Sequence, residues 1–161
     1  MYSKIMVPLD GSDLAECVMP HVTAIISAFK SKEVVLARVV NPVRLPISVP
    51  ARGNFGFTEK DRQQLDRNRK KDAEIYLEKM VGSLDIPGTV FNFTLMEGNP
   101  ANMLVDFAND NEVDLIVIAS HGRSGVSRWV MGSVAERIIR TSCVPVMMVR
   151  VPGCEPKAKS G

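Results

Sequence analysis

Residues Asp114–Ser133 read DLIVIASHGRSGVSRWVMGS: an apolar run, a segment with three glycines, and the first residue of a helical pattern. The run DLIVIA is typical of a strand buried on both faces. Glycines lack a Cβ, so they let the backbone approach a ligand closely. The order of strand, glycine-rich turn and helix therefore presents two hypotheses, a phosphate-binding turn or an ordinary glycine-shaped loop.

The start of the helix Ser133–Arg140 is the point on which these hypotheses differ. A helix N-terminus offers unpaired N–H groups and a partial positive charge, which favour an anion. A phosphate there could accept a hydrogen bond from Ser133, and Arg123 or Arg128 could add charge. Alternatively, Ser133 and Glu136 have the spacing of a capping box, and the segment lacks the ending of a Walker A motif. The spacing alone leaves both interpretations open.

Strand-like and helix-like segments alternate along the rest of the chain, which predicts a parallel α/β sheet with helices on both faces. We expect one domain over residues 1–151 and a flexible tail over 152–161. The five expected strands are Lys4–Leu9, Glu33–Val40, Thr89–Met96, Asp114–Ala119 and Val144–Val149. The expected helices cover residues 13–29 and Thr58–Val81, begin again at Asn99-Pro100, and cover Ser133–Arg140.

Two of these helices carry more detailed expectations. Asp13 is expected to cap the first, with Glu16 three residues later, and Pro20 to kink it. The helix Thr58–Val81 is charged, and its basic residues are interleaved with acidic ones, which favours a solvated face over a binding patch. The basic residues are Arg67, Arg69, Lys70 and Lys71, and the inward-facing ones are Leu65, Ala73, Tyr76, Leu77 and Met80.

Composition excludes several classes of protein. The net charge of +2 is too small to argue for a nucleic-acid partner, and no apolar run approaches the roughly 20 residues that span a bilayer. A cytoplasmic protein without a membrane partner is the expectation. Cys17 and Cys143 lie in apolar contexts and are expected to be buried, whereas Cys154 is expected to be a free thiol. Asn41–Phe57 is expected to be a long loop.

The polar residues that follow strands predict where a ligand would bind. Ligands of open parallel sheets bind at the carboxyl ends of the strands, near the point where the strand order reverses. Asp10, Val40 and Ala119 each fall at such an end. We therefore expect these positions to border one site.

The order of these segments resembles the universal stress protein family over nearly all of residues 1–151. The resemblance rests on KIMVPLDGS, ARVVNP, EGNPANMLVDFA and, most specifically, VDLIVIASHGRSGVSRWVMGSVAERIIRTSCVPVMMVR. The ATP-binding branch of that family carries Gly, two residues, Gly, nine residues, then Gly-Ser or Gly-Thr. Here Gly122 is the second glycine and Gly132-Ser133 ends the motif, but Ala119 replaces the first glycine. Alanine is acceptable at a negative φ and strained at a positive one.

The resemblance implies a Rossmann-like fold of the adenine-nucleotide alpha-hydrolase type that binds ATP, with Mg²⁺. It implies that Asp10 lies beside the ribose and phosphates and holds the metal, next to Pro8 and Leu9. It implies that the backbone of Val39 recognises adenine, and that His121 shapes the loop. The residues it implies for the phosphates are Gly122, Arg123, Gly132, Ser133 and Val134, beside Ala119.

The resemblance further implies a homodimer that pairs through the last strand, Val144–Val149, and a role as a nucleotide-dependent regulator of the stress response. Two other functions stay open. One is slow ATP hydrolysis, although no catalytic base is identified, because general-base catalysis needs a positioned acceptor. The other is a dimeric protein-interaction module that binds no ATP, or a protein that prefers AMP or a cyclic nucleotide.

Overall fold

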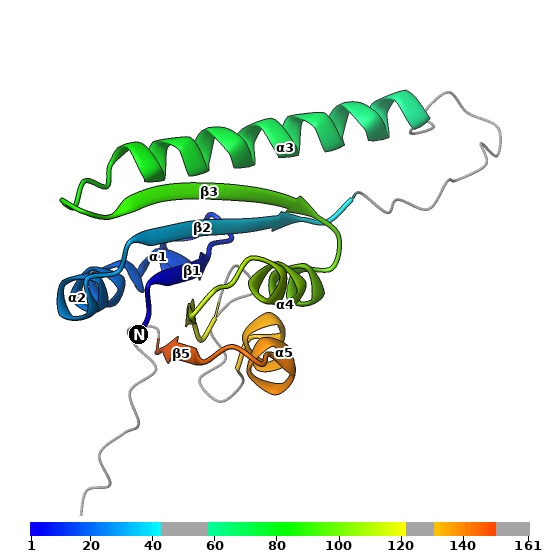
Figure 1. Ribbon diagram of the computed structural model, residues 1–161. Helices are drawn as coiled ribbons and strands as arrows, with labels where there is room; N and C mark the ends of the chain where they lie inside the picture. The colour runs from blue at the N-terminus through cyan, green and yellow to red at the C-terminus, as the bar shows by residue number, and fades with distance from the viewer. Residues whose placement is uncertain (43–57, 122–130, 151–161) are drawn as a thin grey trace, which may run out of the picture.

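The computed structural model describes residues 1–42, 58–121 and 131–150, and every structural statement below concerns these. They form one five-stranded sheet in the order β3-β2-β1-β4-β5, with all neighbouring strands parallel (Figure 1). The predicted single-domain α/β fold is therefore confirmed. The strands are β1 Lys4–Pro8, β2 Glu33–Val40, β3 Val90–Glu97, β4 Leu115–Ala119 and β5 Val146–Val149.

Helices cover both faces of the sheet, as the alternating pattern predicts (Figure 1). One hydrophobic core joins β1, β2 and β4 to α2 and α3, and a second joins the opposite face to α4 and α5. The helices are α1 Asp13–Glu16, α2 Met19–Phe29, α3 Glu59–Gly82, α4 Pro100–Asp110 and α5 Ser133–Thr141. Among these helices none is both long enough and apolar enough to cross a membrane.

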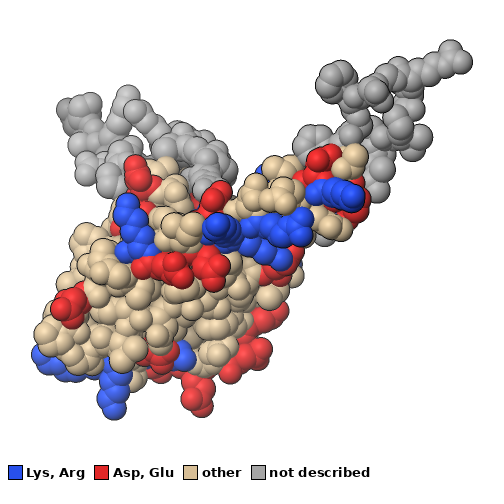
Figure 2. Space-filling view, turned by 90° about the horizontal axis from the view of Figure 1, so that it is seen from above, with Lys and Arg blue, Asp and Glu red and all other residues tan. Residues whose placement is uncertain are grey.

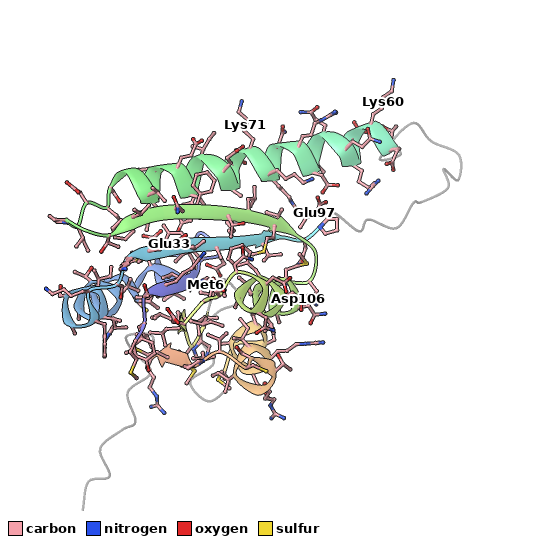
Figure 3. All side chains as sticks on the ribbon, in the orientation of Figure 1. Met6, Glu33, Lys60, Lys71, Glu97 and Asp106 are labelled. Carbon is pink, nitrogen blue, oxygen red and sulfur yellow. The ribbon has the colours of Figure 1, made fainter. Side chains whose placement is uncertain are left out.

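The central strand β1 shows why the strands read as continuous apolar runs. Ile5 and Val7 lie in the first core, whereas Met6 lies in the second (Figure 3). Successive side chains of a strand point to opposite faces, so a strand covered on both faces needs apolar residues at every position. All three side chains are fully buried.

The prediction of one kinked helix after β1 is wrong. Ser12, not Asp13, is the N-cap of α1, because its side chain accepts a hydrogen bond from the N–H of Ala15 at 3.2 Å. The helix stops after Glu16, and α2 begins at Met19 with Pro20 in its first turn. Proline is tolerated there because the first N–H groups of a helix have no intrahelical partner.

Helix α3 confirms the solvated face. Thr58 and Asp61 form a capping box at its start, and Ala73 and Leu77 are its fully buried residues. Acidic and basic side chains are interspersed over the surface of α3 (Figure 2). Lys71 points away from the sheet (Figure 3), and Lys70 forms an ion pair with Glu97 of β3 at 2.5 Å. The four basic residues of the cluster are all exposed.

Two expectations near the C-terminus need correction. Strand β5 begins at Val146 rather than Val144, after Pro145, which cannot donate to a strand ladder. Cys143 is exposed rather than buried, because it lies in the turn between α5 and β5, and Cys17 is only partly buried. Cys154 and most of the loop Asn41–Phe57 lie outside the described residues.

Candidate functional site

A cavity of about 360 Å³ opens at the carboxyl ends of β1, β2 and β4. In the sheet, β2 and β3 lie on one side of β1, whereas β4 and β5 lie on its other side. The boundary between β1 and β4 is thus the reversal point at which parallel sheets bind ligands. The site residues that the resemblance implies and the structure describes all line this cavity: Pro8, Leu9, Asp10, Val39, Ala119, His121, Gly132, Ser133 and Val134. The expectation that Val40 borders the site is wrong, because Val39 faces the cavity and successive side chains of a strand alternate. Gly122 and Arg123 lie outside the described residues.

Asp10 is held at the cavity by the turn between β1 and α1. Its Oδ1 accepts hydrogen bonds from the backbone N–H of Ser12 at 3.0 Å and from the Ser12 hydroxyl at 2.6 Å. Gly11 between them has a φ of +82°, a conformation that glycine adopts without a steric cost. The turn therefore fixes the carboxylate where β1 ends.

The wall beside β2 is apolar. Ala37 and Val39 both line the cavity, because residues two apart on a strand share a face. Leu104 of α4 and Ile118 of β4 complete this wall. Such a surface suits the flat, weakly polar face of a nucleobase, with the strand backbone available for its edge.

Backbone hydrogen bonds join Ser120, directly after β4, to Gly132 and to Val149 of β5. The N–H of Gly132 donates to the carbonyl of Ser120 at 2.8 Å, and the N–H of Ser120 donates to the carbonyl of Val149 at 2.8 Å. A Cβ on Gly132 would lie 3.1 Å from the Ser120 oxygen, a tight contact that favours glycine at this position. The Ser120 hydroxyl and His121 Nδ1 lie 3.0 Å apart, which agrees with a loop-shaping position for His121.

The N-terminus of α5 differs from the capping-box hypothesis. Gly132 is the N-cap, Ser133 is the first helical residue, and among the described residues no side chain forms a capping hydrogen bond at this end. The hypothesis placed the cap one residue too late, because Gly132 bonds to Ser120 and sets the helix start there. The first residues of α5 line the cavity without a side-chain cap, an arrangement that favours an anion.

Ala119, the residue that the resemblance aligns with a motif glycine, is accommodated without strain. It is the last residue of β4 and is 5% exposed. The described non-glycine residues with positive φ are Tyr2, Lys30 and Glu112, so Ala119 does not need a glycine conformation. The departure from the motif adds one methyl group to the cavity wall and no backbone cost.

The model of the universal stress protein family matches residues 1–150. This chain belongs to the universal stress protein family. Universal stress protein MJ0531 of Methanocaldococcus jannaschii is 32% identical over 152 residues, which cover 94% of this chain and 84% of that protein. The solved structure of protein MJ0577, from the same organism, has a TM-score of 0.78 at 28% identity and covers 98% of this chain and 99% of its own.

A third similarity shows the shared fold. A universal stress protein family structure from Arabidopsis thaliana, which has AMP bound, has a TM-score of 0.64 at 15% identity. It covers 94% of this chain and 93% of its own. The fold of the universal stress protein family is thus the fold of this chain.

Sequence reasoning missed the contribution of α4 to the site of this universal stress protein. Pro100 and Leu104 line the cavity, and Asn99 caps the helix by accepting a hydrogen bond from the N–H of Asn102 at 3.3 Å. A signal was present, since Asn99-Pro100 predicts a helix start directly after a strand. In a parallel sheet such starts all lie at the edge where ligands bind.

The site holds few acidic side chains for a metal ion. Within the described residues no group of three or more His, Cys, Asp or Glu side chains could hold a metal ion. Asp10 is the acidic side chain among the described cavity residues. This fits a Mg²⁺ ion that takes one carboxylate and otherwise binds water and phosphate oxygens, but not an all-protein metal site.

Proposed function

We propose that this universal stress protein binds an adenine nucleotide in the cavity between β1 and β4, and that ATP with Mg²⁺ is the ligand. One observation carries the proposal: the uncapped start of α5, Asp10 and an apolar wall meet around one cavity at the sheet's reversal point. The volume lies within the range of roughly 300–1,000 Å³ that small-molecule sites occupy. The Arabidopsis relative with AMP bound supports an adenine nucleotide as the ligand class.

The chemistry of the walls assigns each part of the ligand. The apolar surface of Ala37, Val39 and Leu104 would hold the adenine, with the Val39 backbone at its edge. The carboxylate of Asp10 would accept hydrogen bonds from ribose hydroxyls. Gly132, Ser133 and Val134 would hold phosphate oxygens at the start of α5, together with Gly122 and Arg123 of the motif.

Asp10 would also be the protein's contact with Mg²⁺. A bound Mg²⁺ ion would neutralise part of the phosphate charge. The Ser12 hydrogen bonds to Oδ1 hold the Asp10 carboxylate at the end of β1, beside the cavity in which the ion and the ribose would bind. One carboxylate with substrate phosphates is a common way for proteins to bind Mg²⁺.

We further propose a binding and regulatory function in the cytoplasm rather than rapid hydrolysis. The titratable side chains in the described cavity wall are Asp10 and His121. His121 Nδ1 lies 3.0 Å from the Ser120 hydroxyl. Efficient hydrolysis needs a base aimed at a water molecule, so slow phosphate release is the most that this wall favours.

The proposed assembly is a homodimer through β5. This strand lies at an edge of the sheet, and Met147 and Met148 are 37% and 38% exposed. An open edge strand with apolar side chains is usually covered by another chain or element. Pairing of β5 with its symmetry mate would cover it.

The deciding experiment is isothermal titration calorimetry of nucleotide-free protein with ATP, AMP and cyclic AMP, each with and without Mg²⁺. We expect saturable ATP binding near one per chain, weakened at least tenfold by Ser133→Asp, since a carboxylate would occupy the phosphate position. Ser27→Asp, at an exposed position of α2, is the matched control. Unchanged ATP affinity in Ser133→Asp would show that the phosphates bind elsewhere. No binding of any of the three nucleotides would refute the proposed function and favour a protein-interaction module.

A further inference from the structure

Arg38 lies in β2, two residues before the end of the strand. Its side chain is charged, yet the residue is only 9% exposed. Its neighbours Ala37 and Val39 line the cavity, so Arg38 points to the opposite face of the sheet. Arginine is almost never buried to this extent unless its charge is compensated. Its position directly behind the cavity wall calls for a specific explanation.

The guanidinium of Arg38 lies against the turn that carries Asp10. A Cβ placed on Gly11 would come 2.8 Å from Arg38 Nη1 and 3.1 Å from both Cζ and Nη2. The guanidinium is thus in contact with the Gly11 backbone. Glycine suits position 11 for two reasons. Its φ is +82°, and a side chain there would collide with the Arg38 guanidinium.

On its other side the guanidinium lies over the ring of Tyr76 in α3. Arg38 Cζ is 5.1 Å from the ring centroid, within the range of a cation–π interaction. The Tyr76 hydroxyl donates a hydrogen bond to Glu16 Oε1 of α1 at 2.8 Å. Arg38 is therefore enclosed between the Asp10 turn and an α3 side chain that is itself fixed to α1.

The charges of this cluster act on one another. Burial raises the pKa of Tyr76, the Glu16 hydrogen bond and charge raise it further, the Arg38 charge lowers it, and the Asp10 charge raises it. Asp10 and Arg38 are both close enough to influence one phenol. Asp10, Glu16 and Arg38 therefore all lie close enough to the Tyr76 hydroxyl to act on it, and Asp10 also lines the cavity.

We propose that Arg38 is a positioning residue of the nucleotide site, which holds the turn of Asp10, Gly11 and Ser12 from the far side of the sheet. The inference rests on the proposed function. Arg38 does not line the cavity and acts through Asp10. Binding groups work best when supporting contacts lock their orientation, so loss of the guanidinium loosens the Asp10 carboxylate and weakens binding.

The experiment combines Arg38→Met, Arg38→Lys and Asp10→Asn with the double variant Asp10→Asn/Arg38→Met, using ATP with Mg²⁺ as the probe. Lys4→Met is the matched control, because it also removes one positive charge, which pairs with Glu33 at 3.3 Å, at the ends of β1 and β2 that lie opposite the cavity. We expect Arg38→Met to weaken ATP binding roughly tenfold and Arg38→Lys to restore about half of that loss on a logarithmic scale. Lys4→Met should bind as wild type does.

The double variant separates positioning from general structural support. If Arg38 acts through Asp10, then Arg38→Met weakens ATP binding less than twofold in the Asp10→Asn background. An equal loss in both backgrounds would overturn the proposal, as would unchanged affinity in Arg38→Met. If Arg38→Met does not fold, the same comparison is made with Arg38→Lys.

A ligand-free measurement keeps this inference separate from the proposed function. The Ser12 N–H is protected by its bond to Asp10, so its hydrogen exchange reports the turn directly. We expect faster Ser12 exchange in Arg38→Met than in Lys4→Met. Wild-type protein that binds no nucleotide would refute the proposed function and the site role of Arg38 with it. Wild-type binding together with unchanged Ser12 exchange and affinity in Arg38→Met would overturn the inference alone.

Discussion

The N–H of Gly132 donates a hydrogen bond to the carbonyl of Ser120 at 2.8 Å, so the residue that starts α5 is joined to the residue that follows β4. This bond brings the two ends of the intervening segment together beside the cavity. It requires the two backbones to be so close that a Cβ on Gly132 would lie 3.1 Å from the Ser120 oxygen. The φ of Gly132 is −58°, so glycine is favoured at this position by the closeness of the two backbones rather than by φ.

Gly132→Ala is expected to lower the free energy of unfolding by about 1–2 kcal/mol, because the added methyl group displaces the Ser120 backbone. It should also weaken ATP binding, since the start of α5 shifts with it. Gly82→Ala, at the end of α3, is the control, because nothing lies within 4 Å of a Cβ there. Urea denaturation should show Gly82→Ala unchanged or more stable. Equal effects of the two substitutions would contradict the proximity argument.

Ala119→Gly tests the departure from the family motif. Because Ala119 lies in β4 with an ordinary φ, restoring glycine should lower stability by roughly 0.5–1 kcal/mol and change ATP affinity less than twofold. Calorimetric titration and thermal melts measure the two effects. A tenfold gain in ATP affinity would show that the alanine methyl group obstructs the ligand.

Tyr76 predicts a loss of stability at alkaline pH. A phenol ordinarily has a pKa of about 10, and burial and Glu16 raise the pKa of Tyr76 in the folded protein. Below pH 10 the Tyr76 phenol is protonated in both the folded and the unfolded state. Its hydrogen bond to Glu16 therefore contributes fully to the stability of the folded state. Above pH 10 the unfolded chain releases it first, so stability falls as the pH rises.

Tyr76→Phe should therefore be less stable than wild type at pH 7, by about 0.5–1.5 kcal/mol for the lost bond to Glu16, yet lose less stability between pH 9 and 11. Urea denaturation across this range measures both. Glu16→Gln keeps an acceptor but removes the charge, so its alkaline loss should be intermediate. If Tyr76→Phe loses as much stability between pH 9 and 11 as wild type does, then the loss arises from the titration of another group.

The proposed dimer is tested at β5. Met148→Lys should shift the protein from dimer to monomer in analytical ultracentrifugation, because a charge at the edge strand opposes pairing of apolar surfaces. Ile75→Lys, at a position of α3 that is 52% exposed, should leave the assembly unchanged. A dimer that survives Met148→Lys, or a wild-type monomer, would refute pairing through this strand.

The fold could be predicted from the sequence because the central strands β1 and β4 are apolar on both faces and strand-like segments alternate with helix-like ones along the chain. The errors fall where local and tertiary signals compete. Asp13 and Ser133 have the residue types of caps, yet Ser12 and Gly132 occupy those positions. In the second case the bond from Gly132 to Ser120 sets the helix start, and no local pattern encodes it.

The sequence predicted residues that line the cavity, but it did not predict Arg38, which lies on the opposite face of the sheet. The described residues that the motif implies all line the cavity, since strand ends and helix starts of a parallel sheet lie at one edge. Arg38 could not be found in this way. The sequence around Arg38 is an apolar strand pattern and does not predict which residues the arginine contacts. Its contacts with Gly11 and Tyr76 are formed only in the folded structure.

The bond from the Lys4 N–H to the Asp114 carboxylate at 2.8 Å joins positions 110 residues apart and has a consequence for synthesis. A ribosome adds roughly 5–20 residues per second, so β1 waits on the order of ten seconds for its second neighbour, β4. Asp10 and Val39 are made before the start of α5, to which we assign the phosphates. Under the proposed function, a nascent chain therefore cannot hold the whole nucleotide before α5 has been made.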